Sequence, residues 1–477
     1  MNNYKPTIGI EVHLELKTKA KVFSPSLNDY SSNPNTNINE IDLGYPGVLP
    51  VLNRGVINKA IKACLGLNMT ISKKMHFDRK NYFYPDLAKG YQITQFDTPI
   101  GRDGYILINV DGVSKKIGVS DLHIEEDTAK SLHYNRQTLL NYNRSGVPLI
   151  EIVSCPDMHS KEEAMEYASR LRELMFYLGV SDCKIEEGSM RCDVNISVSN
   201  NESLGVRAEI KNIGSISNIG EAIDYEVKRQ TELLERGEKL EEETRKFDAE
   251  TKTTIFMRKK DSDTDYRYFP EPDIPYLYLE DRDISDIKKD LVMLPDERRR
   301  IYLNKGISLI NTEKLIANKE LSDFINIFLD KDIDFIIASN LLVGDIASYL
   351  NKNRVSIFDT KLNEEKFLRV VESLKREEIS FKIFKDILSD IMESDTLVET
   401  ILNKNKQLDS EEEIIGIINA VLEKYPESVL DYQNGKDRAF KFLMGMIMKE
   451  SKGKASPSLA SRLLRNILLR NSMMSIQ

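Results

Sequence analysis

The sequence predicts an α+β protein, in which a strand-rich N-terminal part is followed by helices alone. Three observations carry this prediction. Apolar and polar residues alternate strictly from Ile8 to Leu16, which is the period of a β-strand. Twelve of the fifteen prolines lie at or before Pro275. From about Asp296 to Tyr425 the chain is poor in proline, and its apolar residues recur at helical spacing.

Length and composition indicate a soluble globular protein. The 477 residues suffice for two to four domains, and 41% hydrophobic with 30% charged residues is an ordinary balance. No apolar run approaches the roughly 20 residues that span a bilayer. The start, Met1 to Pro6, leads almost at once into the first strand and leaves no room for a targeting peptide. We therefore expect a cytoplasmic protein without membrane contact.

Cysteine usage predicts neither disulfides nor a zinc ribbon. The four cysteines are scattered and never form C-x-x-C; they are Cys64, Cys155, Cys183 and Cys192. Such a pattern is typical of reduced, partly buried thiols.

Helix signals interrupt the strand-rich part at three places, 53–67, 160–178 and 221–236. The second opens with Ser160 ahead of two glutamates and closes at Gly179, a typical pair of start and stop signals.

Proline and glycine mark the later boundaries. Pro295 ahead of an acidic turn predicts the start of the helical part, and a further small helical unit is expected from about Asn405. Within that unit Gly435 indicates a turn, and a last helix is expected over 458–469. We expect domains at 1–294, 295–404 and 405–477.

The polar face of the first strand carries Glu11, His13 and Glu15 in one row. Two carboxylates and an imidazole on one face can converge on a divalent cation, or on a phosphate that a cation holds. The alternative is the solvated polar face of an edge strand. This stretch alone leaves both interpretations open.

Other segments repeat the pattern of charged residues opposite aliphatic ones. Glu151 is the only charge in an apolar run, which is costly unless a cation or hydrogen bonds satisfy it; a structural pairing with an arginine is the alternative. The remaining polar faces are His123, Glu125 and Asp127; Arg191, Asp193, Asn195 and Ser197; and Arg207, Glu209 and Lys211. Gathered in one sheet, these rows indicate a site for a metal, a polyphosphate and an acidic substrate.

Several familiar catalytic motifs are absent. The sequence contains no G-x-x-x-x-G-K-[ST] phosphate loop, no G-x-S-x-G elbow and no H-E-x-x-H. Metal-assisted phosphoryl transfer, which needs positioning and charge neutralisation more than a nucleophilic side chain, therefore fits better than covalent hydrolysis.

Charge is unevenly distributed along the chain. The formal net charge is −9, yet the stretch from Lys436 to the C-terminus holds nine Lys or Arg and two Asp or Glu. A basic tail on an acidic body can contact nucleic acid, and it can equally be a solvated helical surface.

Ordered blocks along the whole chain resemble the GatB family, the B subunits of bacterial tRNA-dependent amidotransferase complexes. The blocks that carry the resemblance are Ile8–His13, Phe77–Asp86, Gly90–Gln95, Leu122–Asp127, Pro148–Val153, Glu186–Asn195, Glu209–Asn212, Asp265–Asp273 and Gly453–Ala455. The resemblance implies a cradle domain around a mixed, mainly antiparallel sheet, then a helical domain and a small YqeY-like helical tail.

The same resemblance implies an activity. Such a subunit uses ATP and Mg²⁺ to phosphorylate the side-chain carboxylate of Glu-tRNA(Gln) or Asp-tRNA(Asn). Ammonia from glutamine, released by an amidase-type A subunit, then displaces the phosphate, and a small C subunit completes a heterotrimer. The sequence does not say which of the two misacylated tRNAs is used.

Roles for individual residues follow from the resemblance. It implies catalytic roles for Glu11, His13, Glu125, Glu151, Asp193 and Lys211; metal binding by Glu11, His13, Glu125, Glu126 and Glu151; nucleotide binding by Glu187, Arg191 and Glu209; an ammonia path along Lys80 and Tyr82; and tRNA binding by Lys436, Arg438, Lys452 and Lys454. Glu125 and Glu126 compete, because alternation places Glu125 beside His123 and Glu126 on the other face unless the strand has ended. Glu15 is expected to be a supporting or surface acid.

One departure from the family pattern concerns zinc. Many members carry four cysteines near the N-terminus, where this chain has Ser24, Ser26, Asn39 and Asp42. Serine and asparagine do not replace thiolate ligands, so we expect no zinc and a loop held by other contacts.

Two other functions remain compatible with the sequence. One is a non-catalytic tRNA-binding scaffold whose acidic faces are merely solvated. The other is a stand-alone ATP-dependent ligase that uses free ammonia.

Overall fold

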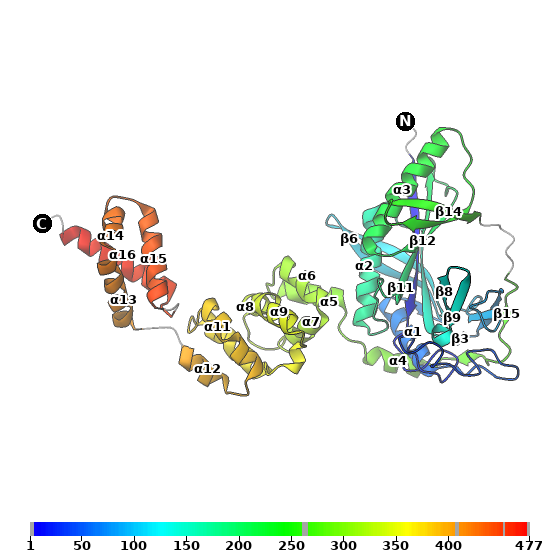
Figure 1. Ribbon diagram of the computed structural model, residues 1–477, viewed down its shortest axis with the longest axis horizontal. Helices are drawn as coiled ribbons and strands as arrows, with labels where there is room; N and C mark the ends of the chain where they lie inside the picture. Colours follow the sequence, from blue (N-terminus) through cyan, green and yellow to red (C-terminus); the bar gives the residue numbers. More distant parts are fainter. Residues whose placement is uncertain (1–3, 260–265, 406–409, 452–453, 475–477) are drawn as a thin grey trace. The chain divides into compact units, whose positions relative to one another are not determined.

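The computed structural model describes residues 4–259, 266–405, 410–451 and 454–474. The chain forms two compact units, Met1–Pro295 and Asp296–Gln477 (Figure 1). The first is built on strands and helices and the second on helices, so the predicted α+β class is confirmed.

A nine-stranded sheet organises the first unit. In spatial order its strands are β14 (Thr253–Lys259), β13 (Glu243–Asp248), β12 (Ala208–Ile213), β11 (Met190–Ser199), β1 (Lys5–Glu15), β10 (Pro148–Ser154), β7 (Val113–Glu126), β6 (Gly101–Val110) and β2 (Thr70–Ile71). The β12–β13 pair is parallel and the other neighbours are antiparallel. The sheet is therefore mixed and mainly antiparallel, as expected.

Strand β1 lies inside this sheet. It pairs with β10 on one side and with β11 on the other, so the edge-strand interpretation of its polar face is wrong. The alternating sequence could not reveal this, because a strand with one buried face reads the same at the centre and at the edge of a sheet. Its polar residues consequently meet polar residues from both neighbours.

The apolar face of the sheet packs against helices α1 (Arg54–Gly66), α2 (Lys161–Tyr177) and α3 (Ile216–Glu235). The aliphatic side chains of β1, from Ile8 to Leu14, are essentially fully buried in this core. Figure 1 shows α2 and α3 running along one side of the sheet. The opposite, polar face is thus left to form a pocket floor.

The helix starts follow side-chain caps. Asn53, Ser160 and Ser215 each accept a hydrogen bond from a backbone N–H of the first turn of α1, α2 and α3. The first two helices match the predicted ranges within a residue. Helix α3 begins five residues before the predicted Glu221, because Ser215 provides an earlier cap.

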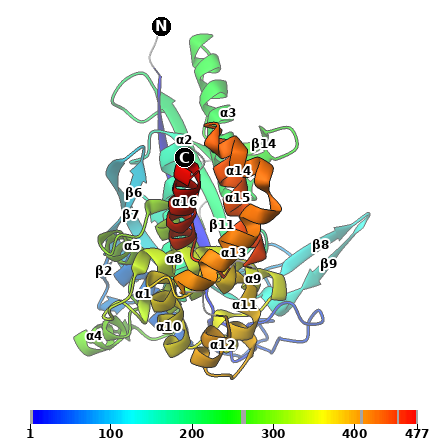
Figure 2. The ribbon, with the colours of Figure 1, turned by 90° about the vertical axis from the view of Figure 1, so that its left-hand side faces the viewer.

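Short strands and a hairpin complete the first unit. They are β3 (Lys74–Met75) paired with β16 (Leu277–Tyr278); β4 (Asp78–Asn81) between β5 (Tyr91–Thr94) and β15 (Phe269–Pro270); and the hairpin β8 (Lys130–Tyr134) with β9 (Gln137–Asn141). The 3-10 helix η1 (Tyr142–Arg144) and helix α4 (Asp281–Lys289) belong to the same unit. Figure 2 shows the β8–β9 hairpin extending outward.

The second unit is helical throughout its described residues. Its elements are α5 (Pro295–Asn304), α6 (Leu309–Ala317), α7 (Lys319–Asn326), α8 (Phe335–Leu341), the π-helix η2 (Leu342–Ile346), α9 (Ala347–Asn353), the 3-10 helix η3 (Ile357–Asp359), α10 (Glu364–Lys375), α11 (Phe381–Glu393), α12 (Val398–Asn405), α13 (Glu411–Lys424), α14 (Pro426–Gln433), α15 (Asp437–Glu450) and α16 (Pro457–Met474).

Helices α13 to α16 share a core of their own, which includes Ile414, Ile418, Leu443, Ile447 and Leu464. Helix α16 extends beyond the predicted 458–469, and Gly435, with φ +82°, separates α14 from α15. The division into three domains stays a prediction.

Two further properties concern the whole described chain. All four cysteines are free. Among the described residues, no helix has the length and apolarity needed to cross a bilayer.

Candidate active site

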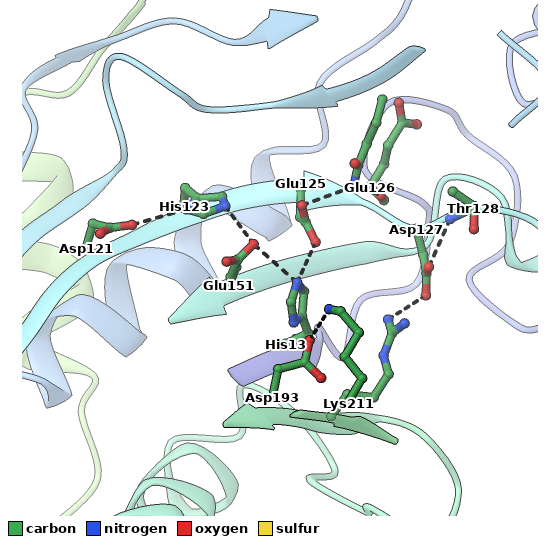
Figure 3. A network of polar contacts seen from close by, with 12 residues as sticks. His13, Asp121, His123, Glu125, Glu126, Asp127, Thr128, Glu151, Asp193 and Lys211 are labelled. Carbon is green, nitrogen blue, oxygen red and sulfur yellow. Dashed lines mark hydrogen bonds and ion pairs between the residues drawn. The ribbon is translucent and has the colours of Figure 1, made fainter. Parts of the chain in front are cut away.

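Polar residues line up across four neighbouring strands at the centre of the sheet. Arg191 of β11, His13 of β1, Glu151 of β10 and His123 of β7 lie directly opposite one another in the strand register. Antiparallel register places such directly opposite side chains on the same face. The sheet itself therefore gathers groups that lie far apart in the sequence (Figure 3).

Two members of this row, His13 and Glu151, converge closely with Glu125 of β7. His13 Nε2 lies 3.4 Å from Glu125 Oε1 and 3.2 Å from Glu151 Oε2. His13, Glu125 and Glu151 each offer one ligand atom, and these atoms lie within 4.8 Å of one another. We call these three residues the central cluster. The sequence-predicted candidates His13, Glu125 and Glu151 are thus brought together.

Neighbouring polar groups hold the two carboxylates in place. Glu151 Oε2 lies 3.0 Å from His123 Nε2, and His123 Nδ1 lies 3.3 Å from Asp121 Oδ1. Gln92 Nε2 donates to Glu125 Oε2 at 3.0 Å. These contacts leave Glu125 Oε1 and Glu151 Oε2 close to the His13 ring.

Burial and mutual charge shift the pKa values in the cluster. Burial lowers the pKa of His13, but the hydrogen bond and charge of Glu151 and the charge of Glu125 outweigh it and raise that pKa to about 9. Burial alone would raise the pKa of Glu151, yet hydrogen bonds from His123 and His13 hold it well below its usual range. Burial raises the pKa of Glu125. These shifts favour an ionised Glu151 carboxylate beside protonated imidazoles when no metal is bound.

Glu11 belongs to a second group of acidic residues, which it forms with residues of β11 and β12 rather than of β10 and β7. Its ligand atom lies within 4.8 Å of those of Asp193 and Glu209. Lys211 Nζ donates to Asp193 Oδ2 at 2.7 Å and lies 3.2 Å from Glu209 Oε1. The ammonium group of Lys211 already neutralises these acids, so this group fits an anchored lysine better than a second metal.

Burial, followed by the nearby charge of Glu151, raises the pKa of Glu11. Glu11 is thus close enough to the central cluster to sense it, although its own hydrogen bond comes from Asn195 Nδ2 at 2.8 Å.

Glu126 does not join the central cluster. Its carboxylate accepts the backbone N–H of Ile93 at 2.9 Å and pairs with Lys89. The alternation of β7 continues through Glu126 and turns this side chain to the other face. Of the two competing candidates, the structure brings Glu125 to His13.

Three other candidates make their polar contacts outside the central cluster. Glu187 is exposed in the turn before β11 and pairs with Lys184. Arg191 donates to Asp127 Oδ2 at 2.8 Å. Glu15 accepts the hydroxyl of Tyr30 at 2.6 Å, which agrees with the supporting role expected of it. Among the predicted nucleotide ligands, Glu209 alone is part of one of the two acidic groups.

A pocket of about 530 Å³ opens above the central cluster. It is lined by Lys80, Thr94, Gln95, Phe96, Pro99, Arg102, Asp103, Ser120, Asp121, His123, Glu125, Glu151 and Tyr268. Lys80 and Arg102 place positive charge on the walls of the pocket, and Glu125 and Glu151 place carboxylates on its floor. The pocket can therefore hold an anion beside a cation.

Lys80 lines this pocket, and Tyr82 lies next to Lys80. The Lys80 ammonium group lies 4.9 Å from the ring centre of Tyr266 and 5.9 Å from that of Tyr82. Burial and then the charge of Glu125 raise the pKa of Tyr82. Both residues thus border the acidic cluster, and Lys80 reaches the pocket wall.

Ser24, Ser26, Asn39 and Asp42, the positions at which the sequence predicts replaced zinc ligands, take part in hydrogen bonds within their own loop. Ser24 Oγ donates to Asp42 Oδ1 at 2.8 Å, and the fully buried Lys21 places its Nζ 3.2 Å from Asp42 Oδ2. The side-chain oxygen of Asn39 accepts the backbone N–H groups of Ile41 and Asp42. These contacts connect the loop to itself through ordinary side chains.

The predicted tRNA-binding residues lie at the ends of helices. Lys436 precedes α15 and donates to Asp431 at 2.8 Å, while Arg438 is exposed in its first turn. Lys454 precedes α16, and Lys452 lies outside the described residues.

His123 belongs to one of the polar rows predicted from the sequence but has no role of its own in that prediction, although it lies 3.0 Å from Glu151 and orients it. The signal was present, because His123 shares its alternating face with Glu125. Gln92, which donates to Glu125, and the rings of Phe96 and Tyr268, which line the pocket, carried no such signal, because they come from the loops and short strands around β4.

Buried acids, imidazoles and cationic side chains around one pocket define an enzyme that handles anionic substrates. Comparison with known proteins agrees. Residues 6–285 match the model of the GatB/GatE catalytic domain, and residues 323–468 match that of the GatB domain. The aspartyl/glutamyl-tRNA(Asn/Gln) amidotransferase subunits B of Staphylococcus aureus strains JH9 and Newman are each 45% identical over 471 residues, which cover 98% of this chain and 99% of the relative.

The chain therefore belongs to the GatB family, the B subunits of tRNA-dependent amidotransferases. The resemblance found in the sequence blocks is confirmed, and membership of this family implies the use of ATP.

Proposed function

We propose that the pocket above the central cluster is where ATP phosphorylates the side-chain carboxylate of Glu-tRNA(Gln) or Asp-tRNA(Asn), and where ammonia then converts it to the amide. The observation that supports this most directly is the convergence of His13, Glu125 and Glu151 beneath a pocket that also contains Lys80.

The donor set fits a magnesium ion. Mg²⁺ is commonly held by one or two carboxylates together with phosphate oxygens and water, and Glu125 and Glu151 supply the two carboxylates. His13 completes the group, although an imidazole is a weaker ligand for this ion. When bound, Mg²⁺ would neutralise the phosphate oxygens of ATP.

The protein side chains then have defined tasks. An attacking carboxylate is already deprotonated, so the first step needs charge neutralisation and alignment more than a base. Its oxygen forms a bond to the γ-phosphorus while ADP leaves. Lys80 and Arg102 on the pocket wall, and Lys211 beside Asp193, lower the cost of bringing these anions together.

The second step forms the amide. Ammonia attacks the acyl phosphate carbon, inorganic phosphate leaves with the C–O electron pair, and the nitrogen loses a proton. We propose that ammonia arrives past Lys80 and Tyr82, whose side chains lie together beside Glu125. Its source is an amidase-type A subunit, with a small C subunit completing the heterotrimer in the cytoplasm.

A smaller pocket of about 250 Å³ is lined in part by Glu11. It is lined by Thr7, Gly9, Ile10, Glu11, Val153, Ser154, Pro156, Asn195, Ile196, Ser197, Leu204, Gly205 and Arg207. We propose that it receives the nucleoside part of ATP. The γ-phosphate would then lie near the central cluster, between the nucleotide on one side and the acyl group on the other.

The test is a Glu151→Gln variant in the complete heterotrimer. Loss of one charge at the cluster should lower both tRNA-stimulated ATP hydrolysis and amide formation by on the order of 10²- to 10³-fold. Glu162→Gln, exposed on α2 over the opposite face of the sheet, is the matched control and should keep full activity. A Glu151→Gln complex with normal ATP turnover would show that the cluster is not the catalytic centre.

The same assays separate the alternatives. A non-catalytic scaffold would bind tRNA without any effect of Glu151→Gln on ATP turnover. A stand-alone ligase would make amide from free ammonia and a small acid without the A and C subunits.

A further inference from the structure

An aromatic pair forms part of the rim of the larger pocket. The rings of Phe96 and Tyr268 are stacked, with centroids 4.2 Å apart and planes only 11° from parallel. Both residues line the pocket that contains Glu125 and Glu151. The two rings come from segments more than 170 positions apart in the sequence, so their stacking is a product of the fold.

One face of this pair is open to a ligand. Tyr268 covers one face of the Phe96 ring, yet 59% of the Phe96 surface stays exposed. Because Phe96 also lines the pocket, part of this exposed surface faces the pocket. An uncovered aromatic face beside a polar pocket is the kind of surface on which nucleobases stack.

Strand β4 holds both rings in place. Buried Asp78, at its start, accepts the backbone N–H of Phe96 at 2.7 Å and that of Asp97 at 3.3 Å. His76 Nε2 lies 3.1 Å from the same carboxyl group.

Asn81, at the other end of β4, anchors the partner segment. Its backbone N–H donates to Tyr266 O at 2.9 Å, and its side-chain amide donates to Arg267 O at 2.7 Å. Lys80, which reaches the pocket wall, lies between these two anchors on the same strand. One short strand therefore positions the aromatic pair and the cationic wall together.

The aromatic pair is close to the reacting groups. Burial raises the pKa of Tyr268 to about 12, and the charges of Glu151 and Glu125 are among the further causes. Arg102 lines the pocket on the Phe96 side, with its Nη2 donating to Asp97 O at 2.5 Å. Carboxylates, a flat apolar surface and two cations thus line one pocket.

We propose that the Phe96–Tyr268 pair is a stacking platform for the 3′-terminal adenine base of the misacylated tRNA. The inference rests on the proposed function, because an amino acid whose side chain reaches the central cluster is esterified to this terminal adenosine. Lys80 and Arg102 are then placed to meet the adjoining phosphate. The base of ATP is the other source of an adenine, and the smaller pocket beside Glu11 receives it instead.

The experiment uses the heterotrimer and tRNA whose terminal adenine is replaced by fluorescent 2-aminopurine. Stacking on the aromatic pair should quench the fluorescence. Phe96→Leu keeps an apolar side chain but removes the flat ring, so it should abolish the quench and raise KM for misacylated tRNA about tenfold, with kcat changed little. Phe96→Tyr should restore both, and Phe176→Leu, a partly exposed phenylalanine of α2 outside this pocket, is the control.

Three outcomes would overturn the assignment. The first is a quench that persists in Phe96→Leu, and the second is a KM for misacylated tRNA that this variant leaves unchanged. The third is a raised KM for ATP with an unchanged quench, which would show that the aromatic pair binds the adenine of ATP instead. A Glu151→Gln complex should still quench, because stacking does not require turnover; normal ATP hydrolysis by that variant would refute the proposed function without touching the platform.

Discussion

Glu125 and Glu126 differ by one position and face opposite environments. Glu125 lies 3.4 Å from His13 above the sheet, whereas Glu126 pairs with Lys89 and accepts the Ile93 N–H below it. Glu125→Gln should therefore abolish Mn²⁺ binding, with Mn²⁺ serving as a spectroscopic probe for the Mg²⁺ site. Electron paramagnetic resonance of the full chain measures the bound fraction.

Glu126→Gln should behave in the opposite way. Mn²⁺ binding should persist, but the chain should lose stability by about 3 kcal/mol, because removing one partner of a buried pair leaves the other charge uncompensated. Thermal unfolding detects this loss. If Glu126→Gln abolished metal binding and Glu125→Gln kept it, the faces of the sheet assigned to these two side chains of β7 would be wrong.

The site was predictable where strand alternation placed a residue, and unpredictable where loops did. His13, Glu125 and Glu151 follow from period-two patterns and the family blocks. Gln92, which donates to Glu125, and Tyr268, which lines the same pocket, come from segments whose spacing carries no periodic signal. The role of Glu187 stays a prediction: its block continues into β11, and the residue itself lies in the preceding exposed turn, where it pairs with Lys184.

At the scale of elements, the loop that lacks zinc ligands depends on a buried ion pair. Lys21 is fully buried, and burial lowers its pKa while the nearby Asp42 opposes that shift. Asp42→Asn should destabilise the first unit by about 3 kcal/mol, since it leaves a buried ammonium group without a counter-charge. Calorimetry of the full chain tests this, with Glu40→Gln, exposed in the same loop, as control.

Zinc provides the complementary measurement. Added zinc should not change the thermal unfolding of the wild-type chain, and elemental analysis should find no stoichiometric zinc. A chain purified with one bound zinc per molecule would contradict the expectation based on Ser24, Ser26, Asn39 and Asp42.

The long β6–β7 hairpin is tied to α2 by a pair with a definite pH dependence. Lys115 Nζ donates to both carboxylate oxygens of Glu163 at 2.9 and 2.8 Å. Burial raises the pKa of Glu163, but Lys115 and the His159 N–H lower it below its usual 4.5. The stabilisation is therefore fully present above pH 4.5 and is lost as the pH falls through the lowered value.

Lys115→Met should accordingly cost about 0.5–1 kcal/mol at pH 7, the range of a partly exposed ion pair, and progressively less below pH 4.5. Calorimetric scans between pH 7 and pH 3.5 give the comparison. Lys184→Met, which removes a more exposed pair with Glu187, should show a smaller effect. A penalty that grew towards low pH would have the wrong sign for this mechanism.

Element positions were predictable to the extent that caps and periodicity were local. Ser160 and Pro295 mark helix starts that the structure reproduces. The central place of β1 was not predictable, because strand order depends on pairings with β10 and β11, whose residues lie more than 130 positions away. That order decides whether the polar face of β1 is a solvated rim or the floor of a pocket.

At the scale of the whole molecule, the C-terminal helices carry the positive charge that the rest of the chain lacks. Deleting the chain from Lys436 onward would be a poor test of this charge. Helices α15 and α16 supply Leu443, Ile447 and Leu464 to a core shared with Ile414 and Ile418. Their removal would expose apolar residues of α13 and confuse impaired folding with impaired tRNA binding.

Charge neutralisation is the sharper experiment. Arg438→Gln combined with Lys454→Gln should weaken tRNA binding and make its salt dependence shallower by about 0.7 to 0.9 in log–log slope for each phosphate that is no longer neutralised. Lys436→Gln should change the slope less, because Lys436 is already paired with Asp431. Binding is measured with the heterotrimer across a salt series.

Lys382→Gln, exposed on α11, is the matched control and should leave the slope unchanged. Phosphate contacts set affinity without touching the reacting groups, so kcat at saturating tRNA should stay normal in all three variants. An unchanged salt slope in the Arg438→Gln/Lys454→Gln variant would mean that these charges form a solvated surface, and that the tRNA is bound elsewhere on the heterotrimer.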